Sequence, residues 1–461
     1  MSTPRAELLT ARLDRLPASR HLWGLVFRIS LGAFFEMFDL FLTGYLGPLL
    51  ARAGIFRAGA RGFAGLTDQA TFAAMTFLGL FVGTLLFSPV ADRLGRRPVF
   101  TGSLLWYTAA TLLMAAQSTA LGVDLWLFVA GVGIGVELVT IDAYISELVP
   151  KGVRGRAFAV STAAQFLGIP AVALLCWIFT AHPPAGLAGW RCVLLFSALG
   201  AIAVWLARAG LPESPRWLIR RGRMEEAERV TAAIEARVGA DIGRPLPEPA
   251  PPTPAETAAP GSFAEIWRPP YRRRTLMLAV FNFFQTIGFY GFGNWLPQFL
   301  AAQGAGVLQG LRYAFIIALA YPLAPLVFLP LADRLERKTQ IVWAAIGVGV
   351  VGLVFSQQRQ PVPLVACGAL VIVFNCFMSF SFHAYQTELF PTRVRARAVG
   401  FCYSWSRLST VLSSYMIAFF LAQFGIRGVF GFIAASMLAV VVAIGGFGPR
   451  TRGLALEAIS Q

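Results

Sequence analysis

Charged residues are scarce in this chain. They make up 13% of its 461 residues, whereas soluble domains average about 25%. Hydrophobic residues instead account for 57%, and apolar runs recur that are long enough to cross a hydrocarbon layer as helices of about 20 residues. The ten-residue alternation typical of membrane β-barrels does not occur in the sequence. The composition therefore excludes a single soluble domain and predicts an all-α polytopic membrane protein.

Cysteine and histidine are also sparse, with five Cys and three His. The Cys residues lie in apolar surroundings without CxxC spacing or neighbouring His, so neither a disulfide framework nor a metal site is indicated. The sequence has no GxxxxGK[ST] motif for ATP and no combined set of nucleophile, base and metal ligands. We therefore expect no cofactor and no enzymatic activity.

Lysine is nearly absent, but 37 Arg give the chain a net charge of +16. If the chain has twelve spans, 29 of the 39 basic residues fall in alternate loops, on the side of both termini. This asymmetry is the positive-inside bias, which predicts cytoplasmic termini, as in a bacterial inner membrane protein. Topology thus explains the basic excess, and nucleic-acid binding is not expected.

Two motifs recur at one displacement of 241 residues. Pro89–Arg97 matches Pro330–Lys338, and Glu147–Ala157 matches Glu388–Ala398. Both copies place their Arg clusters on the same side of the membrane, which indicates two halves of equal orientation, a parallel repeat. The predicted organisation is a tail (1–21), a first six-helix bundle (22–210), a loop with short helices and a Pro-rich linker (211–273), a second six-helix bundle (274–447) and a second tail (448–461).

The hydrophobic runs define twelve spans. The predicted spans are residues 22–50, 69–91, 98–118, 124–147, 156–180, 190–210, 274–301, 309–332, 340–356, 362–387, 397–422 and 428–447.

Several motifs resemble those of the major facilitator superfamily, over essentially the whole chain. Asp92-Arg93-Leu94-Gly95-Arg96-Arg97 resembles the superfamily's loop signature, and Pro212–Leu218 is similar to the PESPRWL segment of sugar porters. Glu36–Gly44 is similar to the EWYDFFLYG pattern of metabolite:proton symporters. The resemblance implies the twelve-helix major facilitator fold and a monomeric carrier that alternately exposes a small-molecule site to the two sides of the membrane.

Three acids in the spans are candidates for proton coupling. Glu36 and Asp39 are three residues apart and are predicted to share a helical face, where their repulsion and desolvation would favour proton uptake. Glu137 in span four can join the same relay. Because ionised groups in spans are costly, such acids are functional hypotheses by default. The alternative is that an Arg or helix-terminal amides hold one acid as a structural group.

Polar groups in the second half are candidates for substrate binding. Arg407 in span eleven either neutralises one of the acids or receives an anionic substrate through bidentate hydrogen bonds. The other candidates are Gln285, Tyr290, Asn294 and Trp295 in span seven, and His383 and Tyr385 in span ten. Each of these groups can equally serve as helix-to-helix contact or as an ordinary packing hydrogen bond.

The repeated loops are candidates for a gate at the cytoplasmic end. Their acids and guanidinium groups can form ion pairs when that end is closed and break them when it opens, whereas plain topological anchoring needs only the Arg residues. The predicted gate residues are Asp92, Arg93, Arg96, Glu147 and Arg154 in the first half, and Asp333, Arg334, Arg337, Glu388 and Arg395 in the second.

These features predict a proton-coupled secondary transporter for a small organic metabolite, with an organic acid anion favoured. A sugar or polyol carrier is the first alternative, supported by Pro212–Leu218 but opposed by the span-seven pattern, in which Phe284 replaces a Gln of sugar porters. A transporter-like receptor or sensor is the second alternative. The expected partners are a small-molecule substrate, protons and the lipid bilayer.

Overall fold

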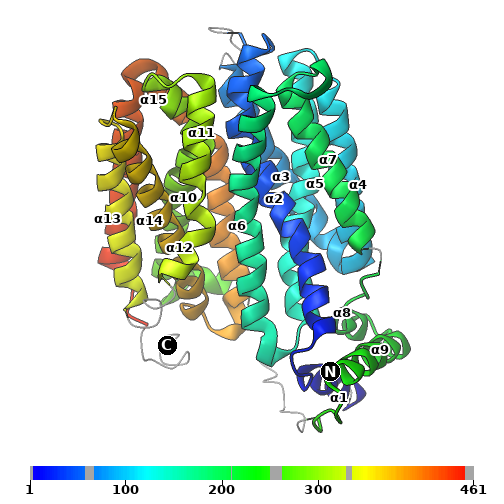
Figure 1. The fold of residues 1–461 in the computed structure, drawn as a ribbon. Coiled ribbons are helices and arrows are strands. Elements are labelled where there is room, and N and C mark those ends of the chain that lie inside the picture. Colours follow the sequence, from blue (N-terminus) through cyan, green and yellow to red (C-terminus); the bar gives the residue numbers. More distant parts are fainter. Residues whose placement is uncertain (1–3, 58–66, 209, 250–261, 329–334, 452–461) are drawn as a thin grey trace.

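The computed structural model describes residues 4–57, 67–208, 210–249, 262–328 and 335–451. Within these residues the regular structure is helical, as Figure 1 shows. Ten helical segments of the described residues are long and apolar enough to cross a membrane. The prediction of an all-α polytopic membrane protein is confirmed.

The first half of the chain forms six long helices. Ser19, Thr67 and Thr119 cap three of them, since each side-chain oxygen accepts a hydrogen bond from a backbone N–H three residues further on. The six helices are α2 (Arg20–Arg52), α3 (Asp68–Leu94), α4 (Arg96–Ala115), α5 (Ala120–Leu148), α6 (Lys151–Ala181) and α7 (Gly189–Arg208).

The second half repeats this pattern with two differences from the predicted spans. The span predicted at 309–332 is divided near Leu319, because Pro322 lacks the N–H that would bond the Ala318 carbonyl. The spans predicted at 397–422 and 428–447 join in one element that turns at Gly425, whose φ of 63° suits glycine. The elements are α10 (Tyr271–Ala302), α11 (Val307–Ala318), α12 (Ala320–Phe328), α13 (Arg337–Phe355), α14 (Pro361–Glu388) and α15 (Thr392–Phe447).

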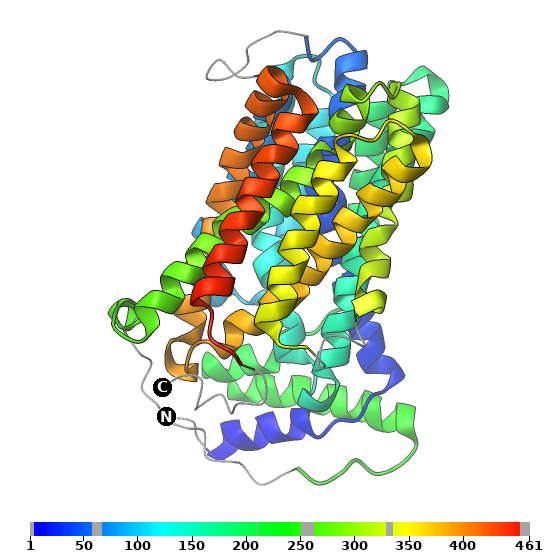
Figure 2. The same ribbon diagram turned by 90° about the vertical axis from the view of Figure 1, so that its left-hand side faces the viewer.

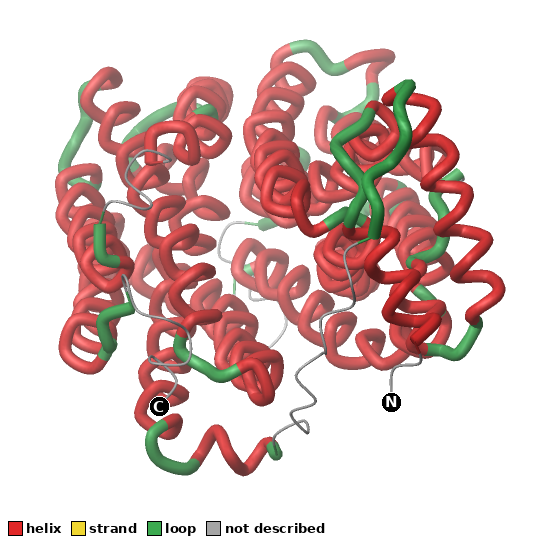
Figure 3. The backbone as a smooth tube through the Cα atoms, turned by 90° about the horizontal axis from the view of Figure 1, so that it is seen from below, coloured by secondary structure: helices red, strands yellow, loops and turns green. Residues whose placement is uncertain are grey.

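Short helices gather at one end of the two bundles, drawn at the bottom of Figure 1 and called the lower end below. Figure 2 shows α9 lying across this end with α1 beneath it. Seen from below, every described segment is helix or connecting loop (Figure 3). The short elements at this end are α1 (Pro4–Asp14), α8 (Pro215–Arg220), α9 (Met224–Ile242) and the 3-10 helix η3 (Phe263–Trp267), whereas a second 3-10 helix, η2 (Pro184–Gly186), connects α6 to α7 at the opposite end.

The two halves pack on each other through a few helices. Within the first half α2 packs on α6 and α7, and within the second half α10 packs on α15. Between the halves, α15 packs on α3, α11 on α6 and α10 on α2. The contacts between the halves therefore run along α2, α3 and α6 on one side and α10, α11 and α15 on the other.

Candidate functional site

A cavity of about 340 Å³ lies between the two bundles. Such a volume is at the small end of the range of about 300–1,000 Å³ usual for small-molecule sites. Its walls come from α2, α5 and α6 in the first half and from α10, α14 and α15 in the second. The lining residues are Ala33, Glu36, Met37, Ile141, Phe158, Ser161, Thr162, Gln165, Phe166, Gln285, Thr286, Phe289, Tyr290, Ser379, Phe380, Phe382, His383, Tyr403, Ser406 and Arg407.

The helices close together above the cavity, at its upper end. A Cβ atom on Gly44 of α2 would lie 2.1 Å from the Asn294 carbonyl oxygen of α10, so only glycine permits this approach. The Gln298 Nε2 donates to the Gly44 carbonyl oxygen at 3.1 Å, and the Thr43 hydroxyl donates to the Asn294 Oδ1 at 3.4 Å. The upper ends of α2 and α10 are therefore in direct backbone contact.

Aromatic rings complete this closure. The rings of Phe41 and Tyr290 have centroids 6.1 Å apart, and those of Phe41 and Tyr321 are 5.5 Å apart. Phe166 stacks on Tyr321 at 5.9 Å and meets Phe380 edge-on at 5.9 Å. Because these rings come from both halves, they form an aromatic layer between the cavity and the upper end.

Arg407 lies in the cavity wall, as a substrate-binding role requires. It is 5% exposed, its Nη2 donates to the Tyr403 hydroxyl at 3.4 Å, and its guanidinium lies 5.0 Å from the centre of the Tyr403 ring. Its Nη1 has no hydrogen-bond partner among the described residues. Among those that line the cavity, Arg407 is also the only Arg or Lys. The cavity therefore presents one buried cation with unused hydrogen-bonding capacity.

Glu36 lies in the wall formed by the first half. Its side chain is buried, and its Oε1 accepts a hydrogen bond from the Gln165 Nε2 at 3.2 Å. Glu36 and Arg407 interact electrostatically within the cavity. The two opposite charges of this site thus come from different bundles, so their interaction depends on how the bundles are arranged.

Asp39 faces away from this cavity. The Ser197 hydroxyl of α7 donates to its Oδ1 at 2.8 Å, while its Oδ2 is buried without a hydrogen-bond partner among the described residues. The spacing of Glu36 and Asp39 predicted one shared face, but Glu36 contacts α6 and Asp39 contacts α7. That part of the prediction is wrong, because α2 is enclosed by different helices around its circumference.

Glu137 is paired with a cation. The Arg208 Nη2 lies 2.6 Å from the Glu137 Oε1, and both side chains are almost completely buried. The Arg208 guanidinium also lies 3.5 Å from the centre of the Phe100 ring. Glu137 in turn acts electrostatically on Asp39. The interior of the first bundle therefore holds a second charged cluster, which is separate from the cavity.

The other predicted binding residues divide into two groups. Gln285, Tyr290 and His383 line the cavity, and the His383 Nδ1 donates to the Ser379 carbonyl oxygen at 2.7 Å. Asn294, Trp295 and Tyr385 do not line it. The first two are buried on α10 near the upper closure, whereas the Tyr385 hydroxyl donates to the Pro449 carbonyl oxygen at 2.8 Å. Asn294 and Tyr385 thus make contacts between segments of the protein.

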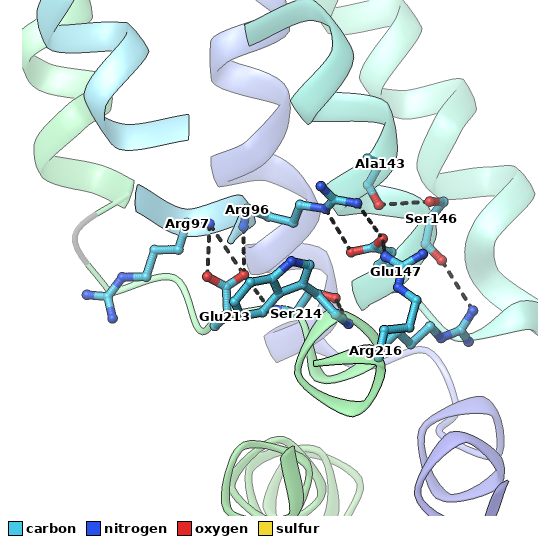
Figure 4. A network of polar contacts seen from close by, with 10 residues as sticks. Arg96, Arg97, Ala143, Ser146, Glu147, Glu213, Ser214 and Arg216 are labelled. Atoms are coloured by element: carbon cyan, nitrogen blue, oxygen red, sulfur yellow. Dashed lines mark hydrogen bonds and ion pairs between the residues drawn. The ribbon is translucent and has the colours of Figure 1, made fainter. Parts of the chain in front are cut away.

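Two of the predicted gate residues of the first half, Arg96 and Glu147, belong to a charge network at the lower end (Figure 4). Arg96 contacts Glu147 through two hydrogen bonds of 3.1 and 3.3 Å, and Arg220 of α8 pairs with the same carboxylate. Glu213 accepts hydrogen bonds from the backbone N–H groups of Arg96 and Arg97. Burial raises the pKa of Glu213 above its ordinary range, although these N–H groups oppose the effect.

The second half repeats one of these pairs. The Arg337 Nε donates to the Glu388 Oε1 at 2.7 Å. Arg337 and Glu388 each lie 241 residues after Arg96 and Glu147, so the sequence repeat is also a repeat of ion pairs. Each pair joins two helices of the same half. The predicted gate, whose ion pairs would form when this end closes and break when it opens, stays a prediction.

The remaining gate residues have other partners or are not described. The Arg154 Nη2 lies 3.7 Å from the Asp14 Oδ1 of α1, and the Arg395 Nε donates to the Phe390 carbonyl oxygen at 3.1 Å. Arg93 is exposed. The side chain of Asp92, and Asp333 and Arg334 entirely, lie outside the described residues.

Several important residues were not predicted from the sequence. Gln165 and Tyr403 line the cavity, and Arg208 and Ser197 hold the buried acids. The sequence carries a weak signal for Gln165 and for Tyr403. Ser161, Thr162 and Gln165 form a polar stripe on α6, and Tyr403 precedes Arg407 by one helical turn. Arg208 gave no signal, because an Arg at the end of a span is usually a topological anchor.

The fold and the cavity define a class of protein. Two helical bundles related by a parallel repeat, with a mainly apolar cavity between them that holds a few polar groups, are typical of secondary transporters. A family model described as "Sugar (and other) transporter" matches residues 25–461, and the chain therefore belongs to that family. It is an integral membrane transporter of the major facilitator superfamily and not an enzyme.

Relatives match over nearly the whole chain. The chain is 27% identical over 452 residues to the niacin transporter NiaP of Acinetobacter baylyi, with 98% of this chain and 99% of the relative covered. It is 26% identical to the inner membrane metabolite transport protein YdjE of Escherichia coli, with 98% of each chain covered. The xylose transporter XylE from E. coli, in a partially occluded inward open conformation, matches with a TM-score of 0.76 at 16% identity, covering 95% of this chain and 100% of that one.

Proposed function

We propose that the protein couples inward proton movement to uptake of a small organic acid anion. The observation that carries the proposal is the Arg407 guanidinium, which is buried in the central cavity with Nη1 unpartnered among the described residues. A buried guanidinium is costly unless an anion pairs with it. A substrate carboxylate supplies this pairing through two parallel hydrogen bonds. The relative named for niacin, a small organic acid, supports the same class of substrate.

The buried acids supply the proton site. Asp39 has one carboxyl oxygen bonded to Ser197 and the other without a described partner, and no described cation forms an ion pair with it. Acids kept inside membrane spans are commonly proton-relay groups. We assign Asp39 as the principal proton-binding site. In this assignment the charge of Glu36 responds to the bound substrate, and the Glu137–Arg208 pair responds to the charge of Asp39.

Alternating access follows from the closure described above. We assign the lower end to the cytoplasm, because the Arg-rich loops and both termini belong to that side. In this assignment the upper contact between Gly44 and Asn294 separates when the cavity loads from outside. Residues 22–210 and 274–447 then move as two bodies. A proton moving inward supplies about 2.3 kcal/mol per 100 mV of membrane potential.

A sugar or polyol carrier is the second candidate. Gln165 and Gln285 face the cavity from opposite halves, and amide groups donate to and accept from hydroxyls equally well. The family and the xylose transporter support it. In that case Arg407 keeps Glu36 as its anion and the substrate carries no charge.

Proteoliposomes distinguish these candidates. Purified protein is reconstituted, an inward proton gradient is imposed, and uptake of labelled nicotinate, benzoate, succinate and xylose is measured with and without a protonophore. The proposal predicts that at least one carboxylate accumulates and that the protonophore abolishes accumulation. Accumulation of xylose alone favours the sugar carrier. Carboxylate uptake that equilibrates without responding to the gradient contradicts proton coupling.

A further inference from the structure

A second cavity lies at the lower end, away from the transport path. It has a volume of about 380 Å³ and lies between α9, the start of α2 and the segment after α7. Its α9 wall is formed by residues that recur every three or four positions, including Arg229, Ala233 and Arg237. The opposite wall includes His21 and Pro212. We call this cavity the α9 groove.

The α9 groove carries an excess of positive charge. Arg229 and Arg237 line it, and the Arg28 Nη1 lies 3.5 Å from the position of a Cβ on Gly210, another lining residue. None of the three Arg forms an ion pair with a described acid. The acids here have other partners: Glu226, which also lines the groove, pairs with Arg223, and the Asp241 Oδ2 accepts from the His21 backbone N–H at 2.6 Å.

The groove also lies where the exposed surface of the protein changes from apolar to polar. Phe27, next to Arg28 on α2, and Leu206, four residues before Gly210 and on the apolar helix α7, are each 61% exposed. Large apolar side chains exposed on such helices face lipid tails. Below them α9 is polar and lies across the lower end (Figure 2). The three guanidinium groups are therefore at the depth of lipid headgroups, the usual depth of cationic side chains at membrane boundaries.

We propose that the α9 groove binds the phosphate group of an anionic phospholipid. Guanidinium groups bind phosphate oxygens through paired hydrogen bonds, and basic pockets near span ends bind anionic headgroups. The glycerol and acyl chains then continue along Phe27 and Leu206. A free phosphate matches the same cations, but it gains nothing from the apolar side chains above them. The bound lipid holds α9, and α1 with it, against the membrane surface.

Lipid retention tests this proposal. The full-length protein is purified in mild detergent, delipidated and titrated with phosphatidylglycerol or phosphatidylcholine, and bound lipid is counted by native mass spectrometry. Wild type is expected to retain phosphatidylglycerol at least threefold more than phosphatidylcholine. The variant R229Q/R237Q is expected to lose this preference. The matched control R272Q/R273Q removes the same charge from exposed residues of α10 and is expected to keep it.

Three results would overturn the proposal. Equal retention of the two lipids by wild type excludes a headgroup site. If both double variants lose the preference for phosphatidylglycerol equally, the lipid is attracted to positive charge in general and does not bind in the α9 groove. Displacement of phosphatidylglycerol by millimolar inorganic phosphate, with no contribution from acyl chains, shows a site for free phosphate. Melting curves of both variants establish that they are folded, and the readout is independent of transport.

Discussion

Arg208 and Glu137 form an ion pair inside the first bundle, with 2.6 Å between the Nη2 of one and the Oε1 of the other. The pair joins α7 to α5 beside Asp39, and Phe100 covers the guanidinium. A cation–anion pair without solvent contact is strongly sensitive to the loss of either partner. The pair therefore links the stability of the first bundle to the charge of the proposed proton site.

Removing one charge of this pair should destabilise the protein strongly. Glu137→Gln leaves Arg208 buried without its counter-charge, which costs about 3–5 kcal/mol. The double variant E137L/R208M removes both charges and should recover much of that loss. Thermal melting in detergent compares the stability of both variants with that of the wild type. The control E226Q breaks a largely exposed pair with Arg223 and should change the free energy of unfolding by less than about 1 kcal/mol. A wild-type melting temperature for E137Q contradicts the structural role.

Gly44 should be needed for closure of the upper end. In Gly44→Ala the new Cβ meets the Asn294 carbonyl oxygen at 2.1 Å, so α2 and α10 must separate. We expect uptake to fall at least tenfold and hydrogen exchange to rise in both helices near the contact. Gly102→Ala is the matched control, because its Cβ meets nothing within 4 Å. Normal uptake by G44A shows that the close approach is dispensable.

The two repeated ion pairs should differ in importance. Side chains of Arg96 and Glu147 are 8% and 10% exposed, whereas those of Arg337 and Glu388 are 27% and 21% exposed. Arg337→Gln should therefore cost about 1 kcal/mol or less, and R96Q should lower the melting temperature more. Equal losses in the two variants are the result that this account does not allow.

Attachment of α1 to α9 should depend on pH through Glu235. Burial alone would raise the pKa of Glu235, but hydrogen bonds from Arg12 and Arg15 outweigh it and hold the pKa below its ordinary value. A depressed pKa contributes stability at pH above the ordinary Glu value of about 4.3, and that stability is lost as pH falls through the lower, folded-state pKa. Limited proteolysis of residues 4–14 should accelerate in that acid range. In E235Q these residues should be cleaved fast at every pH. The same pH dependence of cleavage in E235Q as in the wild type would contradict the prediction.

The sequence predicted features that depend on local pattern or on the repeat. The 241-residue displacement marked the motifs that contain Arg96, Glu147, Arg337 and Glu388, whereas the two pairings came from the structure. Long apolar runs indicated the spans, because hydrophobicity is a property of the local sequence. The break before Pro322 was missed because the apolar run continues through it.

The site was harder to predict because it depends on which helices surround each residue. Spacing on α2 could not separate Glu36 from Asp39, since their partners lie on α6 and α7. Arg208 pairs with a residue 71 positions earlier, and no local pattern indicates that contact. Asn294 is about one turn above Tyr290, the last cavity residue of α10, where the helix enters the upper closure. Such assignments need the packing of the whole bundle.

Asp39→Asn in proteoliposomes tests the central claim most directly. With an imposed inward proton gradient, the wild type should accumulate the carboxylate substrate above equilibrium. The variant should fail to accumulate it, while exchange of labelled for unlabelled substrate, which needs no net proton movement, continues. Ser197→Ala keeps the carboxyl and removes only its hydrogen-bond donor, and it should retain accumulation at a reduced rate. Undiminished gradient-driven accumulation by D39N would contradict the account.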